Sequence, residues 1–130
     1  MDKMKVLVVD DESRMRKLVS DFLTRKGYAV IEAADGVEAV DTFMENKDIA
    51  LIILDVMMPE MDGFEVLAYI NKYHWNDNFA VIMISADDSP VNIKRAYDLG
   101  AFDYISRPFD SAIVQRRISN TMFLYARQQH

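Results

Sequence analysis

Residues 49–55 read IALIILD, six apolar positions in a row followed by an aspartate. Two more stretches share this character, VLVV at residues 6–9 and FAVIMI at residues 79–84. Continuous Val, Ile and Leu are typical of strands that are covered on both faces, as in a parallel sheet. With two weaker runs, these stretches predict five strands, at residues 5–10, 29–34, 49–55, 79–85 and 102–106.

Amphipathic helical patterns fill the intervals between the five runs. Met15, Val19 and Phe22 follow the spacing of one helix face, and Gly27 is expected to end that helix. The later helices are expected to start at Asp62, at Ser89 before Pro90, and at Asp110. The last one carries an apolar stripe of Val114, Ile118, Met122 and Tyr125. Strict alternation of strands and helices predicts an α/β fold, a three-layer α/β/α sandwich with a doubly wound, five-stranded parallel sheet.

Length and composition narrow the class of protein. The 130 residues suit one domain with one core, residues 1–130, and the formal net charge is −6. This charge disfavours nonspecific binding to nucleic acid or to an anionic membrane surface. There is no cysteine, and neither a signal peptide nor a membrane-spanning run is recognisable. We therefore expect a cytoplasmic protein with no direct nucleic-acid or membrane contact.

Chemically active side chains gather where the expected strands end. Asp10 and Asp11 follow the first strand and Asp55 ends the third, so neighbouring strands would bring three carboxylates into one pocket. Converging carboxylates repel, and either a proton or a hard dication can offset that repulsion. Magnesium suits an all-oxygen site. A simpler alternative remains open, in which Asp11 or Ser13 only caps the first helix.

Two further strand ends supply groups that bind phosphoryl oxygens. Ser85 ends the fourth strand and offers a hydroxyl, and Arg107 follows the fifth and offers a fixed positive charge. Beside a bound cation, Asp55 would be able to attack phosphorus and form an acyl phosphate. Taken one at a time, each of these residues has an ordinary structural explanation. The set at four strand ends predicts a phosphoryl site.

The chain resembles the receiver domains of bacterial two-component response regulators, the CheY-like family, over residues 4–125. The resemblance rests on V-V-D-D-E at 8–12, L-D-V-M-M-P-E-M-D-G at 54–63, I-S-A at 84–86, G-A-F-D-Y-I at 100–105 and R-P-F at 107–109. It implies a flavodoxin-like sheet with strand order 2-1-3-4-5. It also implies a phosphorylated signalling switch rather than an enzyme, with self-phosphorylation and autodephosphorylation as its only chemistry.

The resemblance assigns roles to individual residues. Asp55 would be the phosphoacceptor, with Mg²⁺, or Mn²⁺ in its place, held by Asp10, Asp11, Asp55 and the backbone carbonyl of Met57. Ser85 and Tyr104 would form the switch pair that responds to the phosphoryl group.

Three more positions follow from the resemblance. Receivers usually carry lysine where this chain has Arg107, a departure that bears on switching fidelity and phosphoryl lifetime. The Arg107–Pro108 bond would be cis. Met57 and Asp87 would either flank the phosphoryl group and tune its hydrolysis, or be exposed loop residues; both interpretations remain open.

The resemblance also implies partners. A sensor histidine kinase would donate the phosphoryl group, and the last helix would either continue into an output domain, with cyclic-di-nucleotide signalling as one candidate, or fray at its end. A homodimer would form through the fourth helix, fifth strand and fifth helix. Charged residues occupy that region and are otherwise an ordinary solvated face; they are Lys94, Arg95, Asp98, Asp103, Arg116 and Arg117.

Three competing functions come from other classes. A haloacid-dehalogenase-type phosphatase would need an aspartate two residues after Asp55, where this chain has Met57. A flavodoxin-like electron carrier would need a phosphate loop after the first strand, where Asp10, Asp11 and Glu12 would repel the flavin phosphate. A receiver-like docking module that is never phosphorylated is the third alternative.

Overall fold

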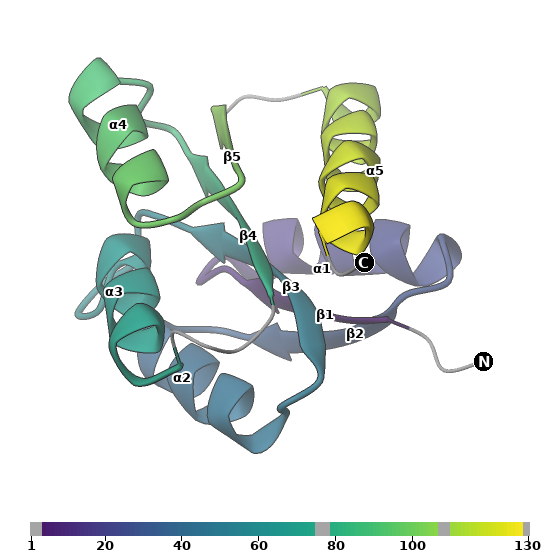
Figure 1. Ribbon diagram of the computed structural model, residues 1–130, viewed down its shortest axis with the longest axis horizontal. Coiled ribbons are helices and arrows are strands. Elements are labelled where there is room, and N and C mark those ends of the chain that lie inside the picture. The colour runs from purple at the N-terminus through teal and green to yellow at the C-terminus, as the bar shows by residue number, and fades with distance from the viewer. Residues whose placement is uncertain (1–3, 75–78, 107–109, 129–130) are drawn as a thin grey trace.

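Five strands alternate with five helices in the computed structural model, which describes residues 4–74, 79–106 and 110–128 (Figure 1). The strands are β1 (Lys5–Val9), β2 (Ala29–Ala33), β3 (Ile49–Asp55), β4 (Ala80–Ser85) and β5 (Asp103–Ser106). The helices are α1 (Ser13–Arg25), α2 (Gly36–Glu45), α3 (Gly63–His74), α4 (Pro90–Asp98) and α5 (Ser111–Gln128). The expected strands are confirmed, with ends that differ by at most one residue.

All strand pairs are parallel, and the order across the sheet is β2-β1-β3-β4-β5. The predicted flavodoxin-like topology is therefore confirmed. β3 lies at the centre and all seven of its residues are buried, which explains its uninterrupted apolar run. Because Lys5 pairs with Ile49 and Val6 with Leu51, Ala50 is an extra residue in β3, a bulge that the apolar run did not reveal.

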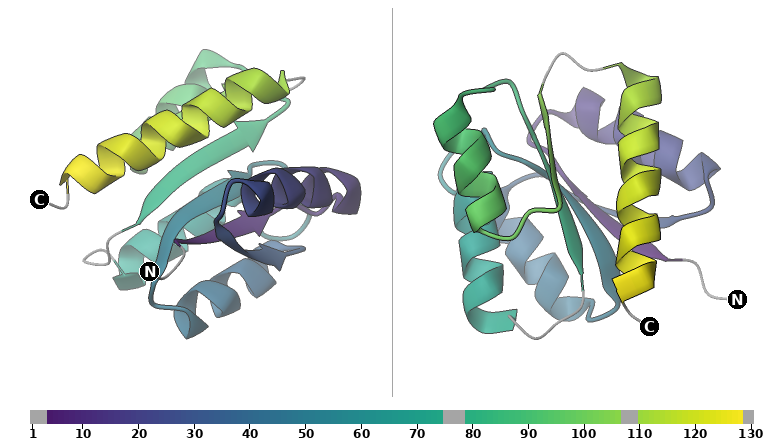
Figure 2. Two further views of the ribbon diagram at one scale, coloured as in Figure 1. Left: turned by 90° about the vertical axis from the view of Figure 1, so that its right-hand side faces the viewer. Right: turned by 45° about the horizontal axis from the view of Figure 1, so that its top comes forward.

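Helices cover both faces of the sheet. α1 and α5 pack on one face, and α2, α3 and α4 on the other, as the right-hand view of Figure 2 shows. β1 serves both cores by strict alternation, since Leu7 and Val9 face α2 and α3 while Val6 and Val8 face α1 and α5. The predicted stripe of α5 is buried in the second core, and Phe123 and Leu124 beside it are exposed.

Helix ends agree with most of the predicted signals. Gly27 follows α1 with a left-handed φ of 97°, which glycine adopts without strain. The Asp62 side chain accepts from the backbone N–H of Glu65, and that of Ser89 from Asn92, as N-caps do. The alternative in which Asp11 or Ser13 caps α1 is wrong: Glu12 holds the N-cap position and makes no side-chain cap bond. No helix among the described residues is both long and apolar enough to cross a membrane.

Candidate functional site

Three carboxylates meet at the C-terminal edge of the sheet. Asp10, Asp11 and Asp55 each present an oxygen atom, and these atoms lie within 4.8 Å of one another. Asp55 is 3% exposed and Asp10 is also buried, whereas Asp11 faces solvent. The structure thus brings together the three residues that the strand pattern predicted would converge.

The sheet itself fixes the two buried carboxylates. β1 and β3 are neighbours, with Val9 opposite Leu54, so Asp10 and Asp55 leave adjacent strands at the same level. Asp10 is held by its backbone N–H, which donates to the carbonyl of Ala33, and its Oδ1 accepts from the backbone N–H of Glu12 at 2.9 Å. These contacts aim both carboxylates into one space.

The loop after Asp55 is packed tightly against the strand end. The backbone N–H of Met57 donates to Asp55 Oδ1 at 3.2 Å, while the Met57 side chain is 60% exposed. Glu60 has a left-handed φ of 67°, a conformation that costs free energy for any residue with a Cβ. A Cβ on Gly63 would lie 2.4 Å from the carbonyl oxygen of Asp55, so only glycine lets α3 start this close to the site.

Ser85 and Tyr104 lie on the neighbouring strands and are joined through Asp87. Ser85 is fully buried, and its Oγ accepts from the backbone N–H of Asp87 at 3.0 Å. Tyr104 is buried and its hydroxyl donates to the Asp87 carbonyl at 2.5 Å. Burial raises the pKa of Tyr104, and a hydrogen bond with Ser85 partly opposes that rise. The predicted switch pair therefore shares contacts at one turn of chain, with Tyr104 directed inward.

The Asp87 side chain is turned toward α4. Its Oδ1 accepts from the backbone N–H of Ser89 at 2.9 Å and its Oδ2 from the Asn92 amide at 2.5 Å. The Ser89 backbone N–H, followed by the Ser89 and Asn92 side chains, lowers the pKa of this carboxyl. Asp87 thus helps to start α4, a role that the sequence reasoning missed although the D-x-S-P-x-N pattern at 87–92 signals it.

An ion pair between Asp103 and Arg117 connects β5 to α5. Arg117 donates through Nε and Nη2 to the two carboxylate oxygens of Asp103, and Nη2 also donates to the Tyr104 carbonyl at 3.1 Å. The hydrogen bonds that Arg117 donates to the Asp103 carboxylate raise the pKa of Arg117. Both residues were expected on a charged dimer face, and the structure pairs them within one chain.

Arg107 and the Arg107–Pro108 bond, both predicted at the site, lie outside the described residues. Arg16, which the sequence reasoning did not single out, donates to the Asp10 carbonyl at 2.7 Å and to Glu32 at 3.0 Å, and so anchors the start of α1 beside the acidic residues. Its position one turn after the acidic run, on a helix face next to β2, is the signal that would have found it.

The chemistry of the cluster fits a hard divalent cation. The donors are carboxylate oxygens, the ligands that Mg²⁺ prefers, and one exposed member leaves room for water. Three like charges this close favour any ligand that reduces their repulsion. The arrangement can bind a dication and hold one buried carboxylate beside it.

Known proteins share both the sequence and the fold. The family model described as response regulator receiver domain matches residues 6–119. Regulatory protein VanRc of Enterococcus gallinarum is 36% identical over 97% of the chain, which spans only 53% of that protein. A chain in the crystal structure of the CheX-CheY-BeF3-Mg+2 complex from Borrelia burgdorferi is 35% identical, with a TM-score of 0.85. The match covers 92% of this chain and 89% of that one.

A third match concerns a longer protein. The structure of a probable two-component system response regulator/GGDEF domain protein is 29% identical with a TM-score of 0.87, and it covers 95% of this chain and 50% of that one. The chain thus spans about half of two of these proteins.

Proposed function

The chain belongs to the family of response regulator receiver domains of two-component systems, and from this premise we propose that Asp55 accepts a phosphoryl group from a sensor histidine kinase. Receiver domains are signalling switches that interact with histidine kinases and output domains, and they are not generally classed as enzymes. The observation that carries the proposal is the convergence of Asp10, Asp11 and Asp55 within 4.8 Å.

The reaction is a displacement at phosphorus. An Asp55 carboxylate oxygen forms the new P–O bond as the P–N bond to the kinase histidine breaks, and the imidazole leaves with its electron pair. Asp10, Asp11, Asp55 and the Met57 carbonyl would hold Mg²⁺, which would reduce the negative charge that the phosphoryl group meets. The bond from the Met57 N–H fixes the orientation of the Asp55 carboxylate at the strand end. Substitution of Mn²⁺ for Mg²⁺ stays a prediction.

The phosphoryl group biases the switch pair through its contacts. The Ser85 hydroxyl and Arg107 bind phosphoryl oxygens, so Ser85 exchanges its present contact with the Asp87 N–H for one to the phosphoryl group. Tyr104, whose hydroxyl is bonded to the Asp87 carbonyl, responds to that movement. The exposed Met57 side chain tunes hydrolysis of the acyl phosphate. The Asp87 carboxylate is bonded toward α4 and takes part in that tuning only if it leaves Ser89 and Asn92.

Three features of the proposal remain predictions. An output domain joined to the receiver is one of them, with cyclic-di-nucleotide signalling as its candidate function, since a response regulator/GGDEF domain protein is among the similar structures. A homodimer forms through α4, β5 and α5, where Lys94 is paired with Asp98 and Arg117 with Asp103 inside one chain. The protein works in the cytoplasm.

Acetyl phosphate with Mg²⁺, read by intact mass, tests the proposal. The chain should gain one phosphoryl adduct, which Asp55→Asn abolishes and Asp48→Asn, at an exposed position on the other edge of the sheet, preserves. No adduct with any phosphoryl donor would instead favour the docking module that is never phosphorylated.

A further inference from the structure

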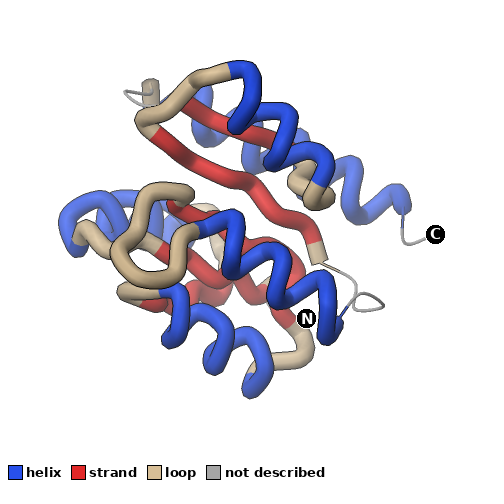
Figure 3. Tube along the Cα trace, turned by 90° about the vertical axis from the view of Figure 1, so that its left-hand side faces the viewer, coloured by secondary structure: helices blue, strands red, loops and turns tan. Residues whose placement is uncertain are grey.

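An apolar groove lies between α2 and α3, on the face away from α1 and α5. It is lined by Val37, Val40, Asp41, Met61 and Tyr69, with a volume of about 220 Å³. Figure 3 shows the two helices side by side along this face of the molecule. The groove is separate from the acidic residues at the strand ends, none of which line it.

Exposed apolar side chains extend the groove along both helices. Val37 is 56% exposed and Met44 43%, and they lie two turns apart on the same side of α2. On α3, Tyr73 is 54% exposed and its ring lies 4.7 Å from that of Tyr69. Apolar and aromatic side chains gathered in this way are typical of a contact surface for another protein.

The size of the groove favours side chains over a small molecule. Pockets that enclose a drug-sized ligand measure roughly 300–1,000 Å³, more than this groove offers. One or two apolar anchors of a partner helix fit it better, and a pair of neighbouring helices is a natural seat for a third.

Carboxylates lie along the two helices that form the groove. Asp41 lines it, and Glu38 and Glu45 are exposed one turn before and after Asp41 on α2, a helix with no basic residue. Glu65 lies in the first turn of α3. The sequence of α3 contains one Lys or Arg residue, Lys72, whose ammonium group lies over the Tyr73 ring. The rim is therefore acidic around an apolar floor, and a complementary partner carries lysine or arginine beside its apolar anchors.

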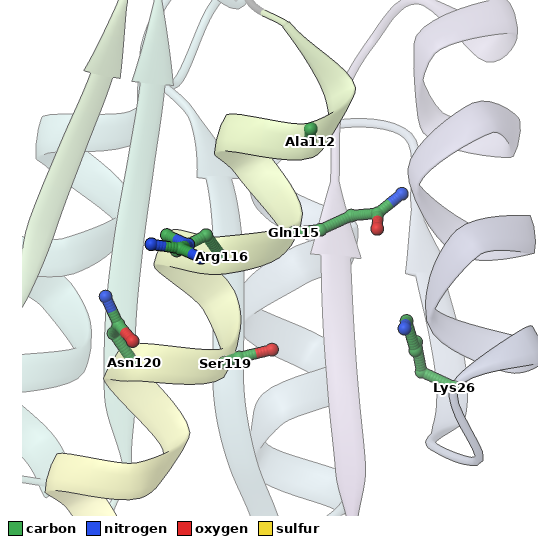
Figure 4. Close-up of a pocket in the computed structure, with 6 residues that line it drawn as sticks. All are labelled: Lys26, Ala112, Gln115, Arg116, Ser119 and Asn120. Carbon is green, nitrogen blue, oxygen red and sulfur yellow. The ribbon is translucent and has the colours of Figure 1, made fainter.

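A second groove on the opposite layer has the reverse charge. It is lined by Lys26 and, from α5, by Ala112, Gln115, Arg116, Ser119 and Asn120. Figure 4 shows Gln115, Ser119 and Lys26 directed toward the space between α5 and α1. No carboxylate lines this groove among the described residues, so a basic partner has no reason to prefer it.

We propose that the α2–α3 groove docks an amphipathic helix of a partner protein that carries apolar anchors flanked by Lys and Arg. The groove also has a direct connection to the phosphoacceptor loop. Met61 belongs to the loop that starts after Asp55, and a Cβ on Gly36 would lie 2.6 Å from the Met61 carbonyl oxygen. Movement of that loop therefore reaches the first turn of α2. This second part, a docking affinity that depends on phosphorylation, rests on the proposed function.

The test uses a synthetic helical peptide with leucine at i, i+3, i+4 and i+7 and lysine on its other face, followed by amide NMR shifts of the full chain. Shifts should concentrate on α2 and α3, and the same peptide with glutamate in place of lysine should bind at least about tenfold more weakly. Val37→Ser and Asp41→Asn should each weaken binding about threefold or more. Matched substitutions at exposed positions of other helices, Val91→Ser and Asp21→Asn, should leave it unchanged.

Several outcomes would overturn the proposal. These are absence of binding, shifts confined to α1 and α5, equal affinity for the two peptides, or self-association that Val37→Ser abolishes, which would make a second copy the occupant. The coupling is read by repeating the titration with beryllofluoride and Mg²⁺. Unchanged affinity would refute the coupling and leave the docking site intact, whereas failure of the proposed function would show as absence of a phosphoryl adduct at Asp55.

Discussion

The two helical layers of this molecule differ in charge and in how they are attached to the acidic site. α1 carries four basic residues and one acidic residue, and α5 carries three basic residues and none that is acidic. On the opposite layer, α2 carries three carboxylates and no basic residue. The layers thus present surfaces of opposite charge on either side of one sheet.

The attachments differ as well. The α1–α5 layer meets the site at the start of α1, through the bond from Arg16 to the Asp10 carbonyl. The other layer meets it through the loop that precedes Gly63 and through the Ser85–Asp87–Tyr104 contacts, which continue into α4. We therefore expect a movement at Asp55 to reach α3 and α4 through these contacts more directly than it reaches α1.

The largest expected effect comes from crowding the loop between Asp55 and Gly63, which connects the site to the layer of α2, α3 and α4. Gly63→Ala would place a Cβ 2.4 Å from the Asp55 carbonyl oxygen and 2.9 Å from Val56 Cα, so the backbone must shift. We expect the free energy of unfolding to fall by about 2–3 kcal/mol in urea denaturation. Gly100→Ala is the control, since it meets only the strain of a φ of 96° in open space. An equal loss in both variants would contradict the tight attachment.

The next effect concerns Asp11, the exposed carboxylate of the cluster, which lies just before α1. Asp11→Asn removes one charge from the cluster, and we expect Mg²⁺ affinity measured by calorimetry to fall about tenfold, or about 1.4 kcal/mol. Glu12→Gln, at the adjacent exposed position outside the cluster, should change it little. Equal affinities for the two variants would remove Asp11 from the ligand set.

A smaller effect is expected at the inward side chain of β5. Tyr104→Phe keeps the ring in the core but removes the bond to the Asp87 carbonyl, so stability should fall by about 1 kcal/mol. Tyr97→Phe, on an exposed ring whose hydroxyl makes only a 3.4 Å contact with Asp103, should cost less. If both variants cost the same, the attachment of α4 through Tyr104 is not significant.

The smallest effect is a pH dependence at the start of α4. The Ser89 backbone N–H and the other Asp87 contacts lower the pKa of Asp87 below its ordinary value of 3.8. A depressed pKa stabilises the fold above pH 3.8, and this contribution is lost as the pH falls through the folded pKa. Carboxyl carbon NMR should follow that titration together with the Ser89 amide shift. In Asp87→Asn the amide shift should no longer move, and a midpoint at or above 3.8 in the native chain would refute the contact.

The strand edge and its three aspartates were predictable because they depend on one-dimensional signals. A continuous apolar run ends at Asp55 and another at Asp10, and parallel strands place their C-terminal ends at the same edge. The convergence within 4.8 Å then needed only that β1 and β3 be neighbours. Ser85 followed from the same reasoning.

Side-chain direction was not predictable in this way. Asp87 and Asp103 have the same residue type as the site carboxylates, yet hydrogen bonds turn Asp87 to Asn92 and Asp103 to Arg117. Those choices depend on rotamers and on contacts between elements that are distant along the chain. The bulge at Ala50 was not predicted either, because one extra apolar residue does not change the pattern of an apolar run.

The contact between Asp103 and Arg117 has a practical consequence for measuring the state of this protein. Arg117 donates hydrogen bonds to the Asp103 carboxylate and to the Tyr104 carbonyl, so the middle of α5 is bonded to β5. The chain contains no cysteine, and Asn120, one turn further along α5, is exposed. A cysteine introduced at that position and spin-labelled, paired with one on α1, would report the distance between α5 and α1 without any competing native thiol.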